Sequence, residues 1–167
     1  MRSLRVPLCI VAVLMLTAIS IEPDDRDQTA YVPVIMKKSD LLNSVFMQDA
    51  REFETPGKIY IYENMIFIVD LYKGIHIIDN QDPSNPHKIG FLYIPGVMDL
   101  AIRNNVLFAD NSIDLVSIDI NSYPEIQILD RVTEVFPEPT PPDLLWIPWA
   151  YSSNRRPENT VIVAWVK

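Results

Sequence analysis

The sequence predicts an all-β fold of two propeller-like, four-stranded antiparallel units, forming an open pair and not a closed ring, with one short N-terminal helix. Three observations support this prediction. A pattern recurs after about forty residues, and short apolar runs alternate with turn-forming residues. The runs are also apolar on both alternating sets of positions, which is expected when each sheet is sandwiched between neighbours.

Three pairs of identical residues mark the repeat, at spacings of 40 or 41: Asn64 and Asn105, Phe67 and Phe108, and Asp79 and Asp119. Repeats of this length with several strands each are typical of propellers and solenoids, in which each unit buries its faces against its neighbours. The matched segments define unit 1, residues 56–95, and unit 2, residues 96–135.

Residues 1–20 are predicted to be a signal peptide. Arg2 and Arg5 precede an uncharged apolar run, and Ala18 and Ser20 supply small residues for cleavage. The run is short for a stable membrane span, although retention as an uncleaved anchor is an alternative, and it would be the only part of the chain in contact with a membrane. We therefore predict export, to the periplasm, the outer membrane surface or the extracellular space.

The next two segments connect the signal peptide to the repeats. Residues 21–36 begin with an acidic, proline-bearing stretch and are predicted to be a tether. Residues 37–55 are predicted to hold a short helix and a linker. Apolar residues spaced as on one helix face place that helix over 40–47, with Ser39 as its N-cap, covering an edge of the sheets.

Each unit is predicted to contain four strands, separated by turn formers such as Pro56-Gly57 and Pro95-Gly96. In the turn before the third strand we expect Gly74 to need a positive φ. The predicted strands are 58–62, 65–70, 74–79 and 88–94 in unit 1, and 98–103, 105–110, 113–119 and 126–132 in unit 2.

Residues 136–167 form a tail rich in proline and tryptophan that ends in a predicted strand, 160–166. Six of the 14 prolines fall between residues 137 and 157, and all three tryptophans lie in the tail. Two blades alone leave apolar faces uncovered, because repeat arrays commonly need at least three units. We therefore expect the segment from Phe136 onward to pack on a blade face, with self-association as the alternative.

One segment of unit 1 resembles a known family. It runs from Gly74 through Ile-His-Ile-Ile-Asp-Asn-Gln-Asp-Pro-Ser-Asn to Pro86, followed by Lys88-Ile-Gly-Phe. This apolar strand, ending in Asp and followed by an Asp-Pro-x-x-Pro turn, is similar to the LVIVD repeat of bacterial cell-surface and lipoprotein-like proteins. The resemblance covers about residues 31–136 and implies a propeller-like fold. Unit 2 departs from it, because the turn ending at Pro124 is two residues shorter and lacks the first proline.

The net charge and the composition limit the classes of partner that the chain could bind. The formal net charge of -8 becomes -10 after removal of residues 1–20, because two of the 14 basic residues are lost and no acid is. A chain this acidic repels phosphate backbones, so nucleic acid is a poor partner. The only cysteine, Cys9, lies within the apolar run, so the exported chain would have no disulfide.

The positions of the titratable residues favour structural roles over catalytic or metal-binding ones. Asp79 and Asp119 end strands and are predicted to accept hydrogen bonds from turn amides. His76 lies on an apolar strand and is predicted to be a packed core residue. An acid pair such as Glu134 and Glu138 could serve a glycosidase only at a defined separation, which the sequence does not establish. We predict no catalytic residue, metal site or cofactor.

Trp146, Trp149 and Tyr151 are the candidate ligand-binding residues, because such side chains offer large rigid faces with a polar tip. Alternatively, these aromatics fold back to cover a blade edge. Function classes remain open at this point. We favour an exported cell-envelope module that binds an envelope protein or a glycan, or acts as a scaffold. The alternatives are an exported hydrolase with a site on loops, or a truncated family member without activity of its own.

Overall fold

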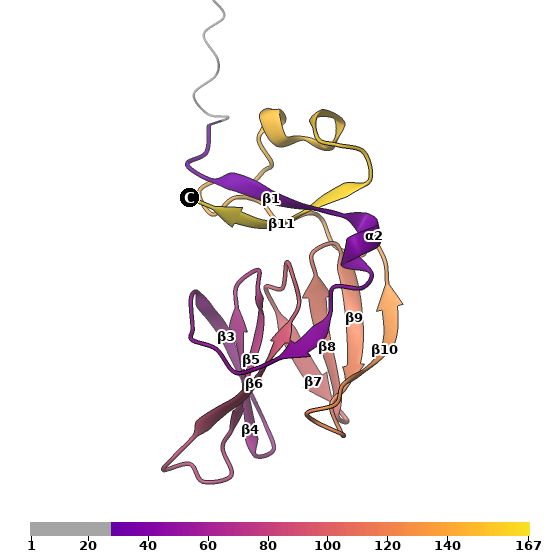
Figure 1. Ribbon diagram of the computed structural model, residues 1–167. Coiled ribbons are helices and arrows are strands. Elements are labelled where there is room, and N and C mark those ends of the chain that lie inside the picture. The colour runs from indigo at the N-terminus through magenta and orange to yellow at the C-terminus, as the bar shows by residue number, and fades with distance from the viewer. Residues whose placement is uncertain (1–27) are drawn as a thin grey trace, which may run out of the picture.

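The computed structural model describes residues 28–167 and confirms the predicted fold class. The chain forms antiparallel β-sheets that stay open, with one short helix near the N-terminal side (Figure 1). The predicted signal peptide, and the tether as far as residue 27, lie outside the described residues.

Unit 1 forms a sheet that we call blade 1. It contains the four predicted strands in up-and-down order and, as an addition, the short strand β2 on the edge beside β6. Its strands are β2 (Phe46–Gln48), β3 (Pro56–Tyr62), β4 (Met65–Asp70), β5 (Gly74–Asp79) and β6 (His87–Tyr93).

Unit 2 forms a four-stranded sheet that we call blade 2. Its strand order is β10-β9-β8-β7, as the up-and-down prediction requires. The strands are β7 (Leu100–Arg103), β8 (Val106–Asn111), β9 (Asp114–Asp119) and β10 (Gln127–Val132).

The predicted helix over 40–47 is too long. Helix α2 covers only Lys38–Leu41, its preceding residue makes no side-chain cap, and Ser39 lies inside the helix. Phe46 instead begins β2, which pairs with Tyr93 and its neighbours on β6. The free edge of β6 offers backbone partners that helical periodicity alone does not reveal, and this tertiary pairing decides the conformation.

The prediction that the tether extends to residue 36 is also wrong. Val32–Lys37 forms strand β1, which pairs antiparallel with β11 (Thr160–Val166), the strand predicted at the end of the tail. The two make a separate ribbon above the blades (Figure 1). The ribbon packs through Val161 and Val163 on Leu41 of α2 and on Ile113, in the turn between β8 and β9.

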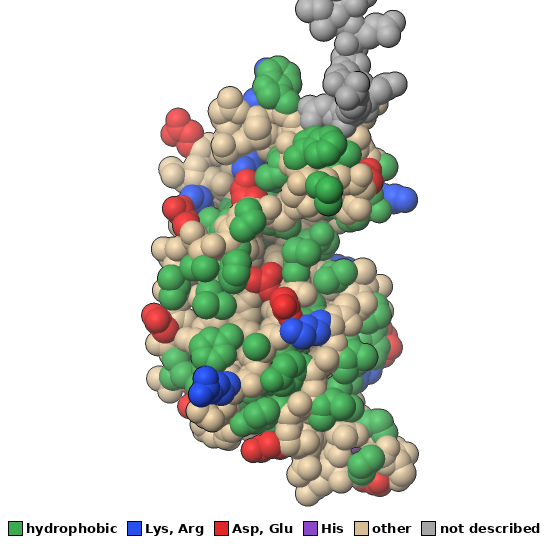
Figure 2. Space-filling view, turned by 180° about the vertical axis from the view of Figure 1, so that it is seen from behind, with side chains coloured by type: hydrophobic (Ala, Val, Ile, Leu, Met, Phe, Trp, Pro, Cys, Tyr) green, Lys and Arg blue, Asp and Glu red, His purple; other side chains and the backbone are tan. Residues whose placement is uncertain are grey.

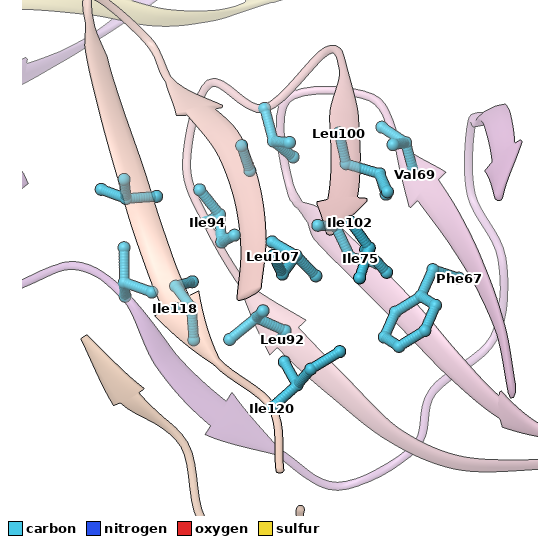
Figure 3. Close-up of a cluster of buried hydrophobic side chains, with 14 of the residues drawn as sticks. Phe67, Val69, Ile75, Leu92, Ile94, Leu100, Ile102, Leu107, Ile118 and Ile120 are labelled. Carbon is cyan, nitrogen blue, oxygen red and sulfur yellow. The ribbon is translucent and has the colours of Figure 1, made fainter. Parts of the chain in front are cut away.

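The main core lies between the two blades. Blade 1 contributes side chains from β4, β5 and β6, blade 2 contributes side chains from β7, β8 and β9, and the two sets point toward each other (Figure 3). Residues such as Phe67, Ile75 and Leu107 have no exposed surface. The inner face of each blade is therefore buried by the other, in the way that neighbouring propeller blades bury one another.

Tyrosine hydroxyls join the blades at the margin of this core. Tyr60 donates to the carbonyl of Ile102 over 3.0 Å. The Tyr62 hydroxyl accepts a hydrogen bond from the Asn105 amide over 3.0 Å and contacts the Asn105 side chain. These bonds satisfy polar groups that would otherwise be left unpaired beside an apolar interface.

The strand-end aspartates behave as predicted. Asp79 accepts a hydrogen bond from the Gln81 amide and Asp119 from the Asn121 amide, each over 2.8 Å. The prediction that Gly74 needs a positive φ is wrong, because the residue with a positive φ in that turn is Tyr72. Gly74 is required for space: a Cβ there would overlap the carbonyl of Leu92 and lie 2.6 Å from the ring of Phe91.

Candidate functional site

A cleft of about 530 Å³ lies on the face of blade 2 that points away from blade 1. One wall is the sheet itself, and the other is the chain segment 136–140, which crosses beside it. Figure 2 shows hydrophobic side chains spread in patches over one side of the molecule, with acidic and basic side chains between them. We call the cleft between this sheet face and segment 136–140 the blade 2 cleft.

The 136–140 wall is held in place by the tail. Glu138 forms an ion pair with Arg156 at 2.6 Å and accepts a hydrogen bond from the Ile162 amide on β11. The buried indole of Trp165 donates to the carbonyl of Pro139 over 2.8 Å. Segment 136–140 therefore lies beside the open face of blade 2, so the prediction that the chain from Phe136 packs on a blade face holds for this first part of the tail, whereas β11 forms the separate ribbon.

The floor of the cleft is apolar. Phe108 and Leu115 project from β8 and β9, and Ala101 lies between them and Lys58 at the opening. Ala101 occupies the repeat position that Tyr60 holds in blade 1, 41 residues earlier. Replacing a tyrosine by an alanine at that position removes most of a side chain, and the cleft extends over this space.

The charged groups around the cleft are already paired. Asp99 forms an ion pair with Lys58 at 2.5 Å. Asp110 accepts hydrogen bonds from the amides of Met98, at 2.9 Å, and Asp99, at 2.8 Å. Burial nevertheless raises the pKa of Asp110, because the desolvation of its carboxylate outweighs these hydrogen bonds.

The three predicted ligand-binding aromatics do not line this cleft. Tyr151 folds back edge-on against the buried Trp165 of β11, with ring centroids 5.6 Å apart, so it packs on the ribbon, whereas the alternative placed it on a blade edge. Trp149 is 61% exposed and lies under the guanidinium of Arg155, and Trp146 is 47% exposed. These tryptophans belong to the loop that carries the 3₁₀ turn η2 (Trp149–Tyr151), beside the ribbon.

His76 is a packed core residue, as predicted. Its ring is fully buried, with Nε2 3.0 Å from a carboxylate oxygen of Asp70. Phe53 covers it at a centroid distance of 4.3 Å, and the ring of Phe91 lies 4.8 Å away. His76 is on blade 1 and takes no part in the blade 2 cleft, so the structure does not bring it together with Asp99, Asp110 and Glu138.

Phe53 belongs to a segment that we call the strap, residues 49–55. It connects β2 to β3, which form opposite edges of blade 1, so it crosses the outer face of that sheet. Asp70 fixes its far end by accepting hydrogen bonds from the amides of Glu54, at 3.0 Å, and Thr55, at 2.7 Å. Burial acts to raise the pKa of Asp70, but the hydrogen bonds with His76 and these amides outweigh it and lower the pKa.

The acid pair considered above, Glu134 and Glu138, lines one small pocket of about 280 Å³, and each carboxylate has its own basic partner. Glu134 pairs with Lys38 of α2, whereas Glu138 pairs with Arg156. Within residues 28–167, no three His, Cys, Asp or Glu side chains gather in a way that could hold a metal ion. None of the helices in this part of the chain is long and apolar enough to cross a membrane.

Comparison with known proteins returned no match to a family model, to a curated protein or to a solved structure. The geometry therefore has to carry the functional argument. Sequence reasoning missed the blade 2 cleft, although one observation pointed to it. Phe108 and Leu115 match the buried Phe67 and Ile75 of blade 1, and residues 136–167 do not continue the repeat.

Proposed function

We propose that the chain is an exported cell-envelope binding module with LVIVD-type β repeats, and that it recognises its partner through the blade 2 cleft. The observation that carries the proposal is the apolar floor of this cleft. The matching repeat positions of blade 1 are buried against a neighbouring sheet, so this face of blade 2 is suited to being covered by a partner. Clefts with mostly hydrophobic walls and a few polar groups at the rim are the usual form of binding sites.

The carboxylates favour binding over hydrolysis. Asp99 is engaged by Lys58, Asp110 by two backbone amides, and Glu138 by Arg156. Each therefore stabilises the cleft wall or its opening. A general acid or base must instead lie within hydrogen-bonding reach of a substrate proton.

The partner that fits best is an apolar segment of an envelope protein. The side chains of Phe108, Leu115 and Phe136 offer hydrophobic contact, and burying such area is the main favourable term in protein association. A glycan would favour the exposed Trp146 and Trp149 instead, because aromatic faces suit sugar rings. The two surfaces can be tested separately.

The experiment is capture of solubilised envelope components by the immobilised protein, compared across three variants. Phe108→Asp places a charge on the cleft floor, Trp149→Ala removes the exposed indole, and Leu145→Asp changes another exposed apolar residue of the tail. We expect Phe108→Asp alone to lose the captured proteins, with all variants keeping the wild-type melting temperature within a few degrees. Loss on Trp149→Ala with retention on Phe108→Asp would move the site to the tryptophan loop.

A further inference from the structure

Blade 1 also has an open face, opposite the one that packs on blade 2. The strap covers the part of this face around His76, and the remainder carries five isoleucines. Ile59 and Ile61 on the edge strand are 62% and 65% exposed, and Ile66 and Ile68 on β4 are half-buried. We call this the isoleucine face: Ile59, Ile61, Ile66, Ile68 and Ile78.

The repeat shows what this face is suited to contact. Moving each of its residues forward by 40 or 41 positions gives five hydrophobic residues of blade 2, none more than 5% exposed. All five are members of the inter-blade core: Leu100, Ile102, Leu107, Ala109 and Ile118. Four of the positions that blade 2 buries against blade 1 are therefore exposed or half-buried in blade 1, and the fifth, Ile78, is 8% exposed.

The opposite surfaces match in the same way. In blade 1, Phe67, Ile75 and Leu92 face blade 2 and are fully buried. Their counterparts in blade 2 are Phe108, Leu115 and Val132. Phe108 and Leu115 line the blade 2 cleft, and Val132 is exposed on the neighbouring strand β10.

We propose that a second copy of this chain docks head to tail, with the isoleucine face of one copy covering the blade 2 cleft of the next. The inference rests on the proposed function, because it uses the blade 2 cleft as the recognition surface; a second copy bound there excludes an apolar segment of another envelope protein. The contact continues an interface that already exists within the chain. It is heterologous, since two different surfaces meet, and it builds a ring if the rotation closes. Propellers commonly close with between about four and eight blades.

The contact between copies is weaker than the one within a chain. Asp110 and Ser117 in blade 2 replace Val69 and Ile77 of blade 1, so the receiving face is less apolar. Ala101 and Arg103 replace Tyr60 and Tyr62, so the hydroxyl bonds that join blades 1 and 2 have no counterpart there. Self-association is therefore reversible and depends on protein concentration.

Sedimentation velocity of the full chain over a range of concentrations tests the proposal. The wild-type mass should rise with concentration. Ile61→Lys charges the isoleucine face, and Ala101→Lys charges the cleft. Both positions are solvent-exposed, so the fold and its melting temperature are retained. Each variant should weaken association at least about tenfold, whereas Leu145→Lys, at a site 91% exposed on the tail, should leave it unchanged.

Mixing the two variants tests the direction of the contact. Ile61→Lys retains a working cleft and Ala101→Lys retains a working isoleucine face, so an equimolar mixture should form one-to-one dimers and nothing larger. Association of Ala101→Lys at wild-type strength would mean that two isoleucine faces meet each other, which would overturn the head-to-tail arrangement. A wild-type chain that stays monomeric throughout would overturn the inference, while loss of capture by Phe108→Asp would still support the proposed function.

Discussion

Blades 1 and 2 share one repeat but close their outer faces differently. Blade 1 draws the strap across its face and buries His76 and Asp70 beneath an aromatic ring. Blade 2 holds the proline-bearing segment 136–140 beside its face, leaving a cleft of about 530 Å³. The comparison teaches that the repeat specifies the strands and the shared interface, whereas the outer faces depend on segments outside the repeat.

Removing the tail should have the largest effect, and it should act on blade 2. Deletion of 137–167 takes away β11 with its four buried side chains, Val161, Ile162, Val163 and Trp165. At about 1.5–3 kcal/mol for each buried side chain, the free energy of unfolding should fall by at least about 5 kcal/mol. Thermal melting and light scattering measure this. A truncated chain that stays monomeric and melts with the full one would show that the tail stabilises nothing.

The matched phenylalanines give the sharpest contrast between the blades. Phe67→Ala should cost about 3–5 kcal/mol, because it leaves a cavity in a fully buried site. Phe108→Ala, at the same repeat position, should cost less than about 1.5 kcal/mol, because that ring is only partly buried and the cleft can admit water. Urea unfolding compares the two, and equal losses would mean that the two faces are covered to the same extent.

Gly74→Val should destabilise blade 1 by about 3 kcal/mol or more, because the new side chain would overlap the backbone of β6 as well as Phe91. Blade 2 carries Asp114 at the equivalent position, so the restriction comes from packing and not from the repeat. Gly57→Ala is the control, since its Cβ would meet the movable side chain of Leu71 at 3.1 Å. An unchanged melting temperature for Gly74→Val would refute the argument from space.

Tyr62→Phe should weaken the joint between the blades by about 1–2 kcal/mol. It leaves the Asn105 amide without its hydrogen-bond partner while keeping the aromatic ring. Tyr93→Phe, where the ring packs on Phe46 within blade 1, serves as the matched control. Hydrogen exchange at the Asn105 amide should quicken in the first variant only.

The smallest expected effect is a pH dependence of the free energy of unfolding. It has opposite signs for Asp70 in blade 1 and Asp110 in blade 2. The lowered pKa of Asp70 means that its carboxylate stabilises the fold above its ordinary pKa, and that this is lost as the pH falls through the lowered value. The raised pKa of Asp110 means the reverse: its contribution is complete below its ordinary pKa and declines as the pH rises through the raised value.

Urea titrations at several pH values should resolve these signs. Between about pH 3 and about pH 7, the cost of Asp70→Asn should grow with pH, whereas the cost of Asp110→Asn should shrink. Parallel trends in the two variants would contradict the assignment of a different environment to each carboxylate.

The strands of both blades could be predicted because local features define them. Turn formers separate short apolar runs, and the hairpin of Met65 and Tyr62 lies at the same place in the repeat as that of Val106 and Arg103. Strand β1 could not be predicted in this way. It pairs Val32 with Val166, and no local pattern records a partner so far along the chain.

The candidate site was harder to predict for the same reason. The blade 2 cleft needs segment 136–140 to return to the sheet, which depends on Glu138 meeting Arg156 and the Ile162 amide. The tryptophans were predicted to bind a ligand on the basis of their residue type alone. The more informative residue is Ala101, a small side chain where the repeat has a tyrosine, and only the structure shows that a hollow results.

The ribbon of β1 and β11 has a mechanical consequence. Because Val32 lies opposite Val166, force applied between residue 31 and residue 167 enters the ribbon at one end. The hydrogen bonds are then loaded one after another and unzip at low force, while the inter-blade core bears no tension. The chain should therefore open first at this ribbon when residues 31 and 167 are drawn apart.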